Sequence, residues 1–492
     1  MDENELAYMS IADQARLIEK KEISPVDLVQ TYLNRIDKWD GVLRSWITVC
    51  GDRALKQAKQ AEAEITKGHY RGRLHGIPFG VKDQICTGDV RTSMASILED
   101  DFGGGVTATC VERLEQAGAI LLGKNNLHEF GKGSSVAFHY GEPKNPWNMK
   151  YEPSHSSTGS GIAPAAGLVS GALGEDTGGS IRGPAWANGI VGIHPTFGRV
   201  SRHGGIMYAW TQDTIGPMTR TVEDNAIMME VIAGHDPKDP LSSIRPVPKY
   251  TELLTEDLKG VKLGLVREMS VGRELHPEVD KSLHDALDVL RSLGATIEEV
   301  SLSKAKYAVA LQMLTSDVDV SSMFIKRWLR DRWDEFDYGT RTRLTAAALV
   351  PGSIYSRAMR GRVLVRNEVL EKFKKYDGLI TLMNFVPPLK LDDSRETIHS
   401  NDDVGPRLFK SRRICTYPFS MANVPALSVP TGFTEEDVPM SIQIVGKPFN
   451  EEMVYRVAHA YQMATQWHLR HPDLEKTVGP ALADAQMKLA GE

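Results

Sequence analysis

Three residues have the types and spacing that acid–base and nucleophilic chemistry requires, namely Lys82, Ser156 and Ser180. Lys82 follows the apolar run GIPFGV, so we expect its side chain to reach the interior from the end of a buried strand. Burial favours the neutral amine of a lysine over its ammonium form, and a neutral amine is a usable base. Ser156 lies in the loop SHSSTGSG, and Ser180 follows 24 residues later. Each serine offers a hydroxyl that such a base can activate.

The glycines before Ser180 permit two interpretations. In DTGGSIR, Gly178 and Gly179 allow either a tight structural turn or a close approach of the backbone to a ligand. A single serine in such a loop is more often a turn or cap residue than a nucleophile. The GxSxG elbow of α/β-hydrolases is absent, because Arg182 occupies the position of its second glycine. The sequence therefore disfavours an α/β-hydrolase triad.

Composition and charge are those of an ordinary globular protein. The 492 residues are 41% hydrophobic and 25% charged, and 58 basic against 64 acidic residues give a net charge of −6. No concentrated basic stretch is present, so we expect no nucleic-acid partner. No apolar run has the length of a membrane span, and the acidic N-terminus is unlike a signal peptide. These features predict a cytoplasmic protein without a membrane partner.

The residues that usually bind metals are dispersed. The motif HExxH is absent, and the cysteines lack CxxC spacing; they are Cys50, Cys86, Cys110 and Cys415. We expect reduced thiols, no metal site and no cofactor.

Strand and helix patterns alternate along much of the chain, which predicts an α/β fold. Short apolar runs indicate strands at 76–81, 119–123, 189–193, 261–266, 296–302, 376–383, 425–433 and 441–446. Residues 10–39 read as an all-helical segment, with Ser24 as the cap of a helix that starts at Pro25. Residues 303–376 read as mainly helical. They carry a stripe of methionine and aromatic side chains, which is more often part of the core than a binding surface; its members are Met313, Met323, Trp328, Trp333 and Tyr338.

A set of motifs in a fixed order closely resembles the amidase signature family of serine hydrolases. They include LHGIPFGVKD, KNPW, DTGGSIRGPA, VGIHPTFGRVSRHG, VPALSVPTGF and SIQIVGKPFNEE, and the likeness spans roughly residues 10–470. The resemblance implies an α/β fold with a large mixed β-sheet core that is flanked on both faces by helices.

We expect five consecutive parts on this basis. Residues 1–70 form a helical segment packed on the core, and 71–240 form the signature core with the catalytic triad. Residues 241–302 continue the α/β core. Residues 303–400 are a mainly helical insertion that provides a wall of the substrate pocket. Residues 401–492 supply strands and a helix that rejoin the core.

The resemblance also implies a role for each residue that matches a family motif. Ser180 corresponds to the nucleophile, Ser156 to a bridging serine preceded by a cis peptide bond, and Lys82 to the base. The expected oxyanion hole consists of the backbone amides of Thr177, Gly178, Gly179 and Ser180. Supporting hydrogen bonds are expected from Ser157, Asp176 and Arg182.

Two departures from the family pattern lie beside these residues. The family usually has glycines where this chain has Ser154, His155 and Thr158, so bulk and a titratable imidazole replace them. The family usually has threonine where this chain has Glu175. The Glu175 carboxylate either faces the triad and favours the charged form of Lys82, or points outward into solvent. The sequence leaves both arrangements open.

The resemblance predicts a cofactor-free hydrolase of a small-molecule amide, or of a related carbamate, hydrazide or ester, through an acyl-enzyme on Ser180. We expect a homodimer with a substrate pocket that draws on Gly131, Ser134 and Trp210. Two alternatives stand beside it. The first is the amidase subunit of a tRNA-dependent amidotransferase, which hands ammonia to a partner enzyme. The second is a catalytically dead binding scaffold.

Overall fold

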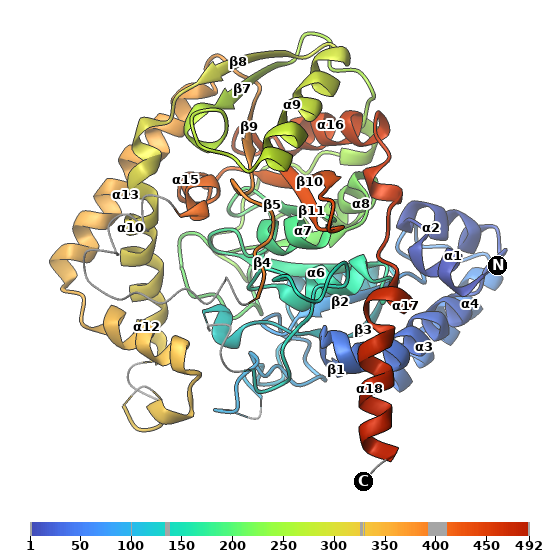
Figure 1. Cartoon of the computed structure of the whole chain (residues 1–492). Coiled ribbons are helices and arrows are strands. Elements are labelled where there is room, and N and C mark those ends of the chain that lie inside the picture. Colours follow the sequence, from blue (N-terminus) through green and yellow to red (C-terminus); the bar gives the residue numbers. More distant parts are fainter. Residues whose placement is uncertain are drawn as a thin grey trace.

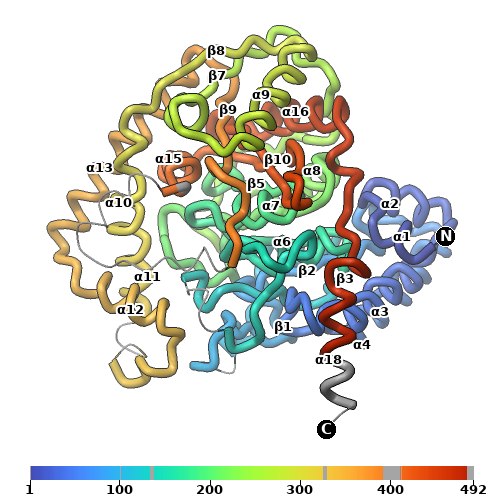
Figure 2. Tube along the Cα trace, viewed as in Figure 1, coloured from blue at the N-terminus to red at the C-terminus, as the bar shows by residue number. Residues whose placement is uncertain are grey.

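The computed structural model describes most of the chain (Figures 1 and 2), namely residues 2–99, 101–132, 138–324, 328, 330–391 and 411–490. The N-terminal helices lie together on one side, and the C-terminal helix extends away from the body.

The strands of the described residues form one eleven-stranded sheet. In spatial order they are β1 (Trp46–Val49), β3 (Ile120–Asn125), β2 (Pro78–Lys82), β4 (Gly171–Asp176), β6 (Thr214–Thr219), β5 (Val191–His194), β10 (Ala426–Phe433), β11 (Pro439–Gly446), β9 (Gly378–Leu382), β7 (Lys262–Val266) and β8 (Thr296–Val300). β2 is parallel to β3 and β4, whereas the strands from β4 to β9 pair antiparallel. The predicted mixed sheet is confirmed.

The parallel register of β2 and β4 explains why distant parts of the sequence meet. Val81 pairs with Leu173, so Lys82 at the end of β2 lies beside the last residues of β4. Parallel strands present their carboxyl ends at the same edge of a sheet. The loops that follow β2 and β4 therefore begin side by side.

Helices cover both faces of the sheet (Figure 1). α6 (Thr158–Ala165) and α7 (Arg182–Asn188) pack on each other and on the middle strands. The opposite layer includes α5 (Thr109–Gln116), α8 (Val222–Ile232), α9 (Pro277–Ser292) and α16 (Glu451–Met463). The chain ends with α17 (Leu474–Thr477) and α18 (Gly479–Ala490). The core is the apolar filling between these helices and the strands.

Residues 10–39 are helical, as predicted, but the wider segment 1–70 also contains a short strand. Its helices are α1 (Glu3–Tyr8), α2 (Ile11–Glu19), α3 (Pro25–Leu43) and α4 (Gly51–Thr66). Ser24 caps α3 as expected, since its Oγ accepts a hydrogen bond from the Val26 amide at 2.9 Å. Between α3 and α4, however, β1 pairs antiparallel with β3. A strand of four residues between two helices is too short for its alternation to stand out.

The segment after β8 is helical, as predicted, and lies at the edge of the molecule (Figure 1). It contains α10 (Ala308–Gln312), a π-helical turn (Met313–Asp317), α11 (Val318–Phe324), α12 (Tyr338–Ala348) and α13 (Gly352–Lys372), and α15 (Tyr417–Ala422) packs against α13.

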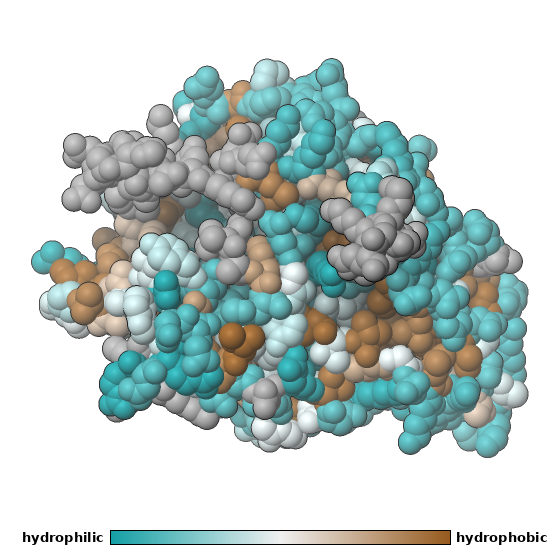
Figure 3. Space-filling model, turned by 60° about the horizontal axis from the view of Figure 1, so that its bottom comes forward, coloured by the Kyte–Doolittle hydropathy of each residue, from teal (hydrophilic) through white to brown (hydrophobic). Residues whose placement is uncertain are grey.

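The expectation that the Met and aromatic stripe is core is wrong for four of its five members. Trp328 is buried, but the side chains that are 40–62% exposed are Met313, Met323, Trp333 and Tyr338. A peripheral helix buries only the face that meets the sheet layer, so its other face stays exposed even where it is apolar. Figure 3 shows similar scattered apolar patches on an otherwise hydrophilic face. Among the described residues, no helix has the length and apolar character to cross a membrane.

Candidate active site

Lys82 is fully buried at the end of β2, as the apolar run before it predicts. Its Nζ lies 2.9 Å from Ser156 Oγ. The same nitrogen contacts the Glu175 carboxylate at 2.7 Å and the Glu175 carbonyl oxygen at 3.4 Å. The structure therefore brings together the expected base and the expected bridging serine.

Ser156 lies in the loop that leads into α6, and the peptide bond between His155 and Ser156 is cis, as expected. The neighbouring residue, Ser157, ties this loop to the loop after β4. Its amide donates to the Ser180 carbonyl oxygen at 3.2 Å, and its hydroxyl donates to the Glu175 carbonyl oxygen at 3.0 Å. These bonds place the loop of Ser156 against the loop of Ser180.

Ser180 lies between β4 and α7 and is partly accessible in a largely buried region. The glycines before it permit close packing. A Cβ at Gly178 would lie 2.5 Å from the Tyr417 ring, and Gly179 has a φ of +118°. The Gly179 amide donates to Asp176 at 2.5 Å, so this member of the expected oxyanion hole is already hydrogen-bonded. The amides of Thr177, Gly178 and Ser180 are the better candidates.

Asp176 and Arg182 form a buried ion pair that holds the Ser180 loop. The Arg182 Nε donates to Asp176 Oδ2 at 3.0 Å, and both side chains are fully buried. Burial alone would raise the pKa of Asp176, but the Arg182 guanidinium and His194 hold it well below its usual range. The Ile181 amide also donates to this carboxylate at 3.1 Å. Asp176 thus fixes the backbone on both sides of Ser180.

Glu175 faces the triad, which decides between the two arrangements that the sequence leaves open. Its side chain is 2% exposed, and its two oxygens have separate partners. Oε2 pairs with Lys82 at 2.7 Å, and Oε1 accepts a hydrogen bond from Thr177 Oγ1 at 2.9 Å. Lys82 therefore has a buried carboxylate partner in addition to the Ser156 hydroxyl.

Asp213 is a second buried carboxylate near Glu175. Burial first, and the negative charge of Glu175 second, raise the pKa of Asp213 to about 7. Its Oδ2 accepts hydrogen bonds from the amides of Tyr208 and Ala209 at 2.5 and 2.9 Å. Burial and the neighbouring Glu175 carboxylate therefore favour the neutral form of Asp213.

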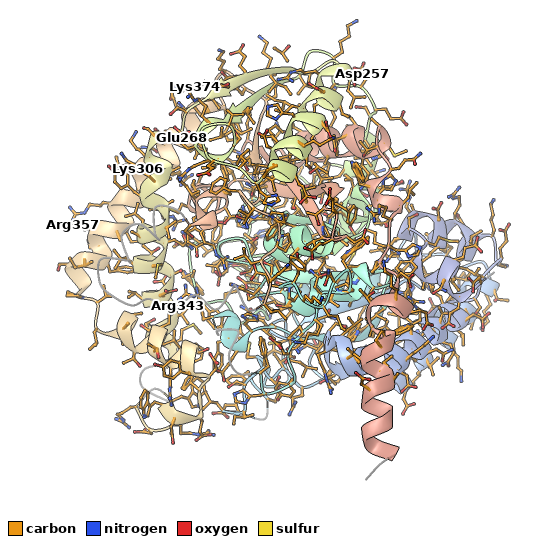
Figure 4. All side chains as sticks on the ribbon, in the orientation of Figure 1. Asp257, Glu268, Lys306, Arg343, Arg357 and Lys374 are labelled. Atoms are coloured by element: carbon orange, nitrogen blue, oxygen red, sulfur yellow. The ribbon has the colours of Figure 1, made fainter. Side chains whose placement is uncertain are left out.

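The cavity in front of Ser180 is polar and cationic. It is lined by Gly131, Lys132, His155, Thr177, Gly178, Ser180, Gln312, Ser316, Arg343, Arg413 and Tyr417. Arg343 extends from α12 (Figure 4) and pairs with Asp317 at 2.6 Å, and Lys132 pairs with the same carboxylate at 3.3 Å. Two cations therefore share one carboxylate, and Arg413 adds a third cationic side chain to the lining.

Of the three residues that were expected to line the substrate pocket, one does so in the described structure. Gly131 lines the cavity, and a Cβ there would lie 3.3 Å from Ser156 Oγ. Ser134 lies outside the described residues. Trp210 is not among the residues that line this cavity. Its side chain is 59% exposed, and the Arg202 guanidinium lies 5.1 Å from the centre of its ring.

The sequence did not predict the cationic side chains that line the cavity. Lys132 directly follows the predicted Gly131, which was a usable signal. Arg343 and Arg413 come from distant segments that carry no motif.

His155 lies at the wall of the cavity. Its ring stacks on His128 with centroids 4.7 Å apart, and the Arg413 guanidinium lies 3.2 Å from its Nε2. The imidazole thus contributes to the polar wall. Elsewhere, no group of three or more His, Cys, Asp or Glu side chains in the described ranges could hold a metal ion.

This fold and site are those of the amidase signature family. The chain matches the Amidase family over residues 27–455, and it belongs to that family. It is an amidase signature enzyme, a class that hydrolyses carbon–nitrogen bonds.

Among curated relatives, the chain is similar to a glutamyl-tRNA(Gln) amidotransferase subunit from Halalkalibacterium halodurans. The two are 38% identical over 501 residues, which cover 95% of this chain and 99% of the relative. The solved structure of the corresponding subunit from Thermotoga maritima superposes with a TM-score of 0.78 at 30% identity, covering 94% of this chain and 96% of that one. The native peptide amidase from Stenotrophomonas maltophilia gives a TM-score of 0.80 at 29% identity, covering 95% and 99%.

The expectation about partners is wrong. The sequence predicted a small-molecule amide substrate, no nucleic acid and a homodimer. Relatives that match over nearly their whole length are instead named as one subunit of an amidotransferase that acts on glutamyl-tRNA(Gln). A net charge of −6 describes one chain, so it does not by itself exclude a nucleic-acid partner.

Proposed function

We propose that this chain is the amidase subunit of a tRNA-dependent amidotransferase, in which Ser180 releases ammonia from an amide donor. The observation that carries the chemistry is the 2.9 Å contact between Lys82 Nζ and Ser156 Oγ, beside the loop of Ser180. The place in a larger enzyme is supported by the similarity to amidotransferase subunits over nearly their whole length.

The reaction proceeds through an acyl-enzyme. Ser156 takes the proton of Ser180 and passes its own proton to neutral Lys82, while Ser180 Oγ bonds to the amide carbonyl carbon. Backbone amides of the Ser180 loop stabilise the oxyanion. The proton then returns from Lys82 through Ser156 to the leaving nitrogen, so the carbon–nitrogen bond breaks and ammonia departs. Water attacks the remaining ester by the same relay, which frees the carboxylic acid and restores Ser180.

The amide donor carries a carboxylate in addition to its carboxamide. Arg413, Arg343 and Lys132 gather at the cavity in front of Ser180, and the last two share the single carboxylate of Asp317. Arginine side chains recognise a carboxylate through paired N–H donors. Glutamine, like asparagine, has both groups, and its free carboxylate suits this wall of the cavity.

Replacement of Arg413 tests the donor class. Arg413→Gln is expected to raise the KM for glutamine about 10-fold or more, because a charge-assisted hydrogen bond contributes roughly 1.5–3 kcal/mol. Hydrolysis of an uncharged amide such as propionamide should change much less. Arg357→Gln is the matched control, because Arg357 is exposed on α13 and away from the cavity (Figure 4). Equal losses on both amides would contradict a role in carboxylate binding.

Coupled turnover tests whether the chain works within an amidotransferase. We expect the chain, mixed with the companion subunits of a bacterial glutamyl-tRNA(Gln) amidotransferase that lacks its own amidase component, to support conversion of glutamyl-tRNA to glutaminyl-tRNA. The product is measured on acid gels or by mass spectrometry of the released amino acid. Ser180→Ala should abolish glutamine-dependent conversion and preserve conversion with added ammonium. Failure of the wild-type chain to bind or complement such subunits from any of its relatives would contradict the proposal.

A further inference from the structure

The contacts of Lys82 conflict with its proposed role as a base. Its nitrogen has three acceptors within reach, namely the Ser156 hydroxyl, the Glu175 carboxylate and the Glu175 carbonyl oxygen. An ammonium group has three N–H donors, so these acceptors match its charged form. A relay that starts from Ser180 needs the neutral amine, which can accept a proton from Ser156. Glu175 therefore stabilises the form of Lys82 that cannot start the reaction.

Other polar groups also lie close to Glu175. Thr177 Oγ1 donates to its other oxygen, and nearby Asp213 is a further buried carboxylate. His194, on β5, also faces this region; burial lowers its pKa, so it brings no positive charge at neutral pH. Among the described groups near Glu175, Lys82 is the cation within ion-pair distance.

Tyr208 is another titratable group near Glu175. Burial, and then the charge of Glu175, raise the pKa of Tyr208 well above its usual value, so it stays neutral. Lys132 acts on Asp213 from the cavity side and pairs with Asp317, not with Glu175. Glu175 therefore keeps Lys82, at 2.7 Å, as its ion-pair partner.

We propose that Glu175 is a positioning residue that holds Lys82 as an ammonium and thereby sets the pH above which the Ser180–Ser156–Lys82 relay operates. The inference rests on the proposed acyl transfer at Ser180. The resting pair must lose one proton to solvent before catalysis, which leaves a neutral amine beside a carboxylate. When Ser180 attacks, the proton that arrives on Lys82 through Ser156 re-forms the ammonium beside Glu175, which stabilises it.

The Glu175 charge is expected to have two opposite effects on the rate: it slows the reaction at low pH and speeds it at high pH. Removing the negative charge of Glu175 makes Lys82 lose its proton more easily, so the acidic limb of the pH–rate profile moves to lower pH. An opposite charge within 4–6 Å shifts such an equilibrium by about one to three pH units. Removing the charge also makes Lys82 a weaker base, so the alkaline plateau falls, roughly 10-fold by Brønsted behaviour. The variant and wild-type profiles should cross.

The experiment measures the second-order rate of Ser180 labelling by a fluorophosphonate between pH 5 and 10, which requires no knowledge of the substrate. Glu175→Gln keeps the size of the side chain and removes its charge, and Glu175→Thr introduces the residue usual in the family. Glu175→Asp retains the carboxylate and should keep its acidic limb closer to that of the wild type. Glu299→Gln, at an exposed position on β8, is the control with an unchanged profile.

The outcomes separate this inference from the proposed function. Crossing profiles for Glu175→Gln and Glu175→Thr support the inference. Ser180-dependent labelling with an acidic limb that stays in place in both variants overturns the inference and leaves the acyl-transfer proposal intact. Absence of labelling at Ser180 in the wild type at every pH overturns the proposed function itself. If Glu175→Gln fails to fold, Glu175→Thr decides the question.

Discussion

Ser180→Ala is expected to lower kcat for ammonia release by about 10⁶-fold, because removal of a nucleophilic serine eliminates the whole covalent pathway. The substitution deletes one oxygen from a loop held by the Asp176–Arg182 pair, so the fold should be unaffected. The measurement is single-turnover ammonia release from glutamine, with thermal unfolding as a check on folding.

The matched control is Ser292→Ala, which removes a hydroxyl at the exposed end of α9. It should retain full activity. If Ser180→Ala kept more than a few per cent of wild-type activity, another nucleophile or a directly activated water would have to perform the reaction. The cavity around Ser180 would then be a binding site rather than the site of acyl transfer.

Arg182→Met is expected to lower the free energy of unfolding by about 3–5 kcal/mol, because it leaves the Asp176 carboxylate buried without its cation. Arg182 is fully buried and also donates to Gln443 and Ser420, each at 2.7 Å. These partners come from β11 and α15, so the side chain joins the Ser180 loop to the C-terminal strands. Loss of activity should accompany the loss of stability.

Urea unfolding measured by circular dichroism tests this value. The control is Arg291→Met, whose ion pair with Asp288 at 2.9 Å is largely exposed and should contribute less than about 1 kcal/mol. Because the pKa of Asp176 lies well below its usual range, the wild-type contribution should persist above ordinary carboxylate pKa values and be lost only in strong acid. A loss below about 1 kcal/mol for Arg182→Met would contradict the account.

Most of the sheet could be predicted because its strands are short apolar runs. The runs at 76–81 and 441–446 correspond to β2 and β11 within two residues. The central strand β4 was missed, since its sequence GALGED combines glycines with two carboxylates. The structure explains those glycines: a Cβ at Gly174 would lie 2.8 Å from the Ile181 side chain. Close packing of the helix after Ser180, rather than strand propensity, determines the residue type there.

The site residues that belong to a sequence motif could be predicted. Those that only the packing of distant segments brings to the site could not. Lys82 lies where the family motifs predicted, in contact with Ser156. Arg343 and Arg413 come from α12 and from the turn before α15, and only the packing of those segments brings them to the cavity. The sequence shows that Glu175 departs from the usual family residue. The side to which its carboxylate points, however, depends on β4, a strand that was not predicted.

The most direct test of the central claim is peptide mapping after reaction with a fluorophosphonate. The account predicts a single phosphonylated peptide that contains Ser180, no label in Ser180→Ala, and strongly reduced labelling in Lys82→Ala and Ser156→Ala. Labelling of a different residue, or unchanged labelling in the Lys82 and Ser156 variants, would contradict the proposed relay.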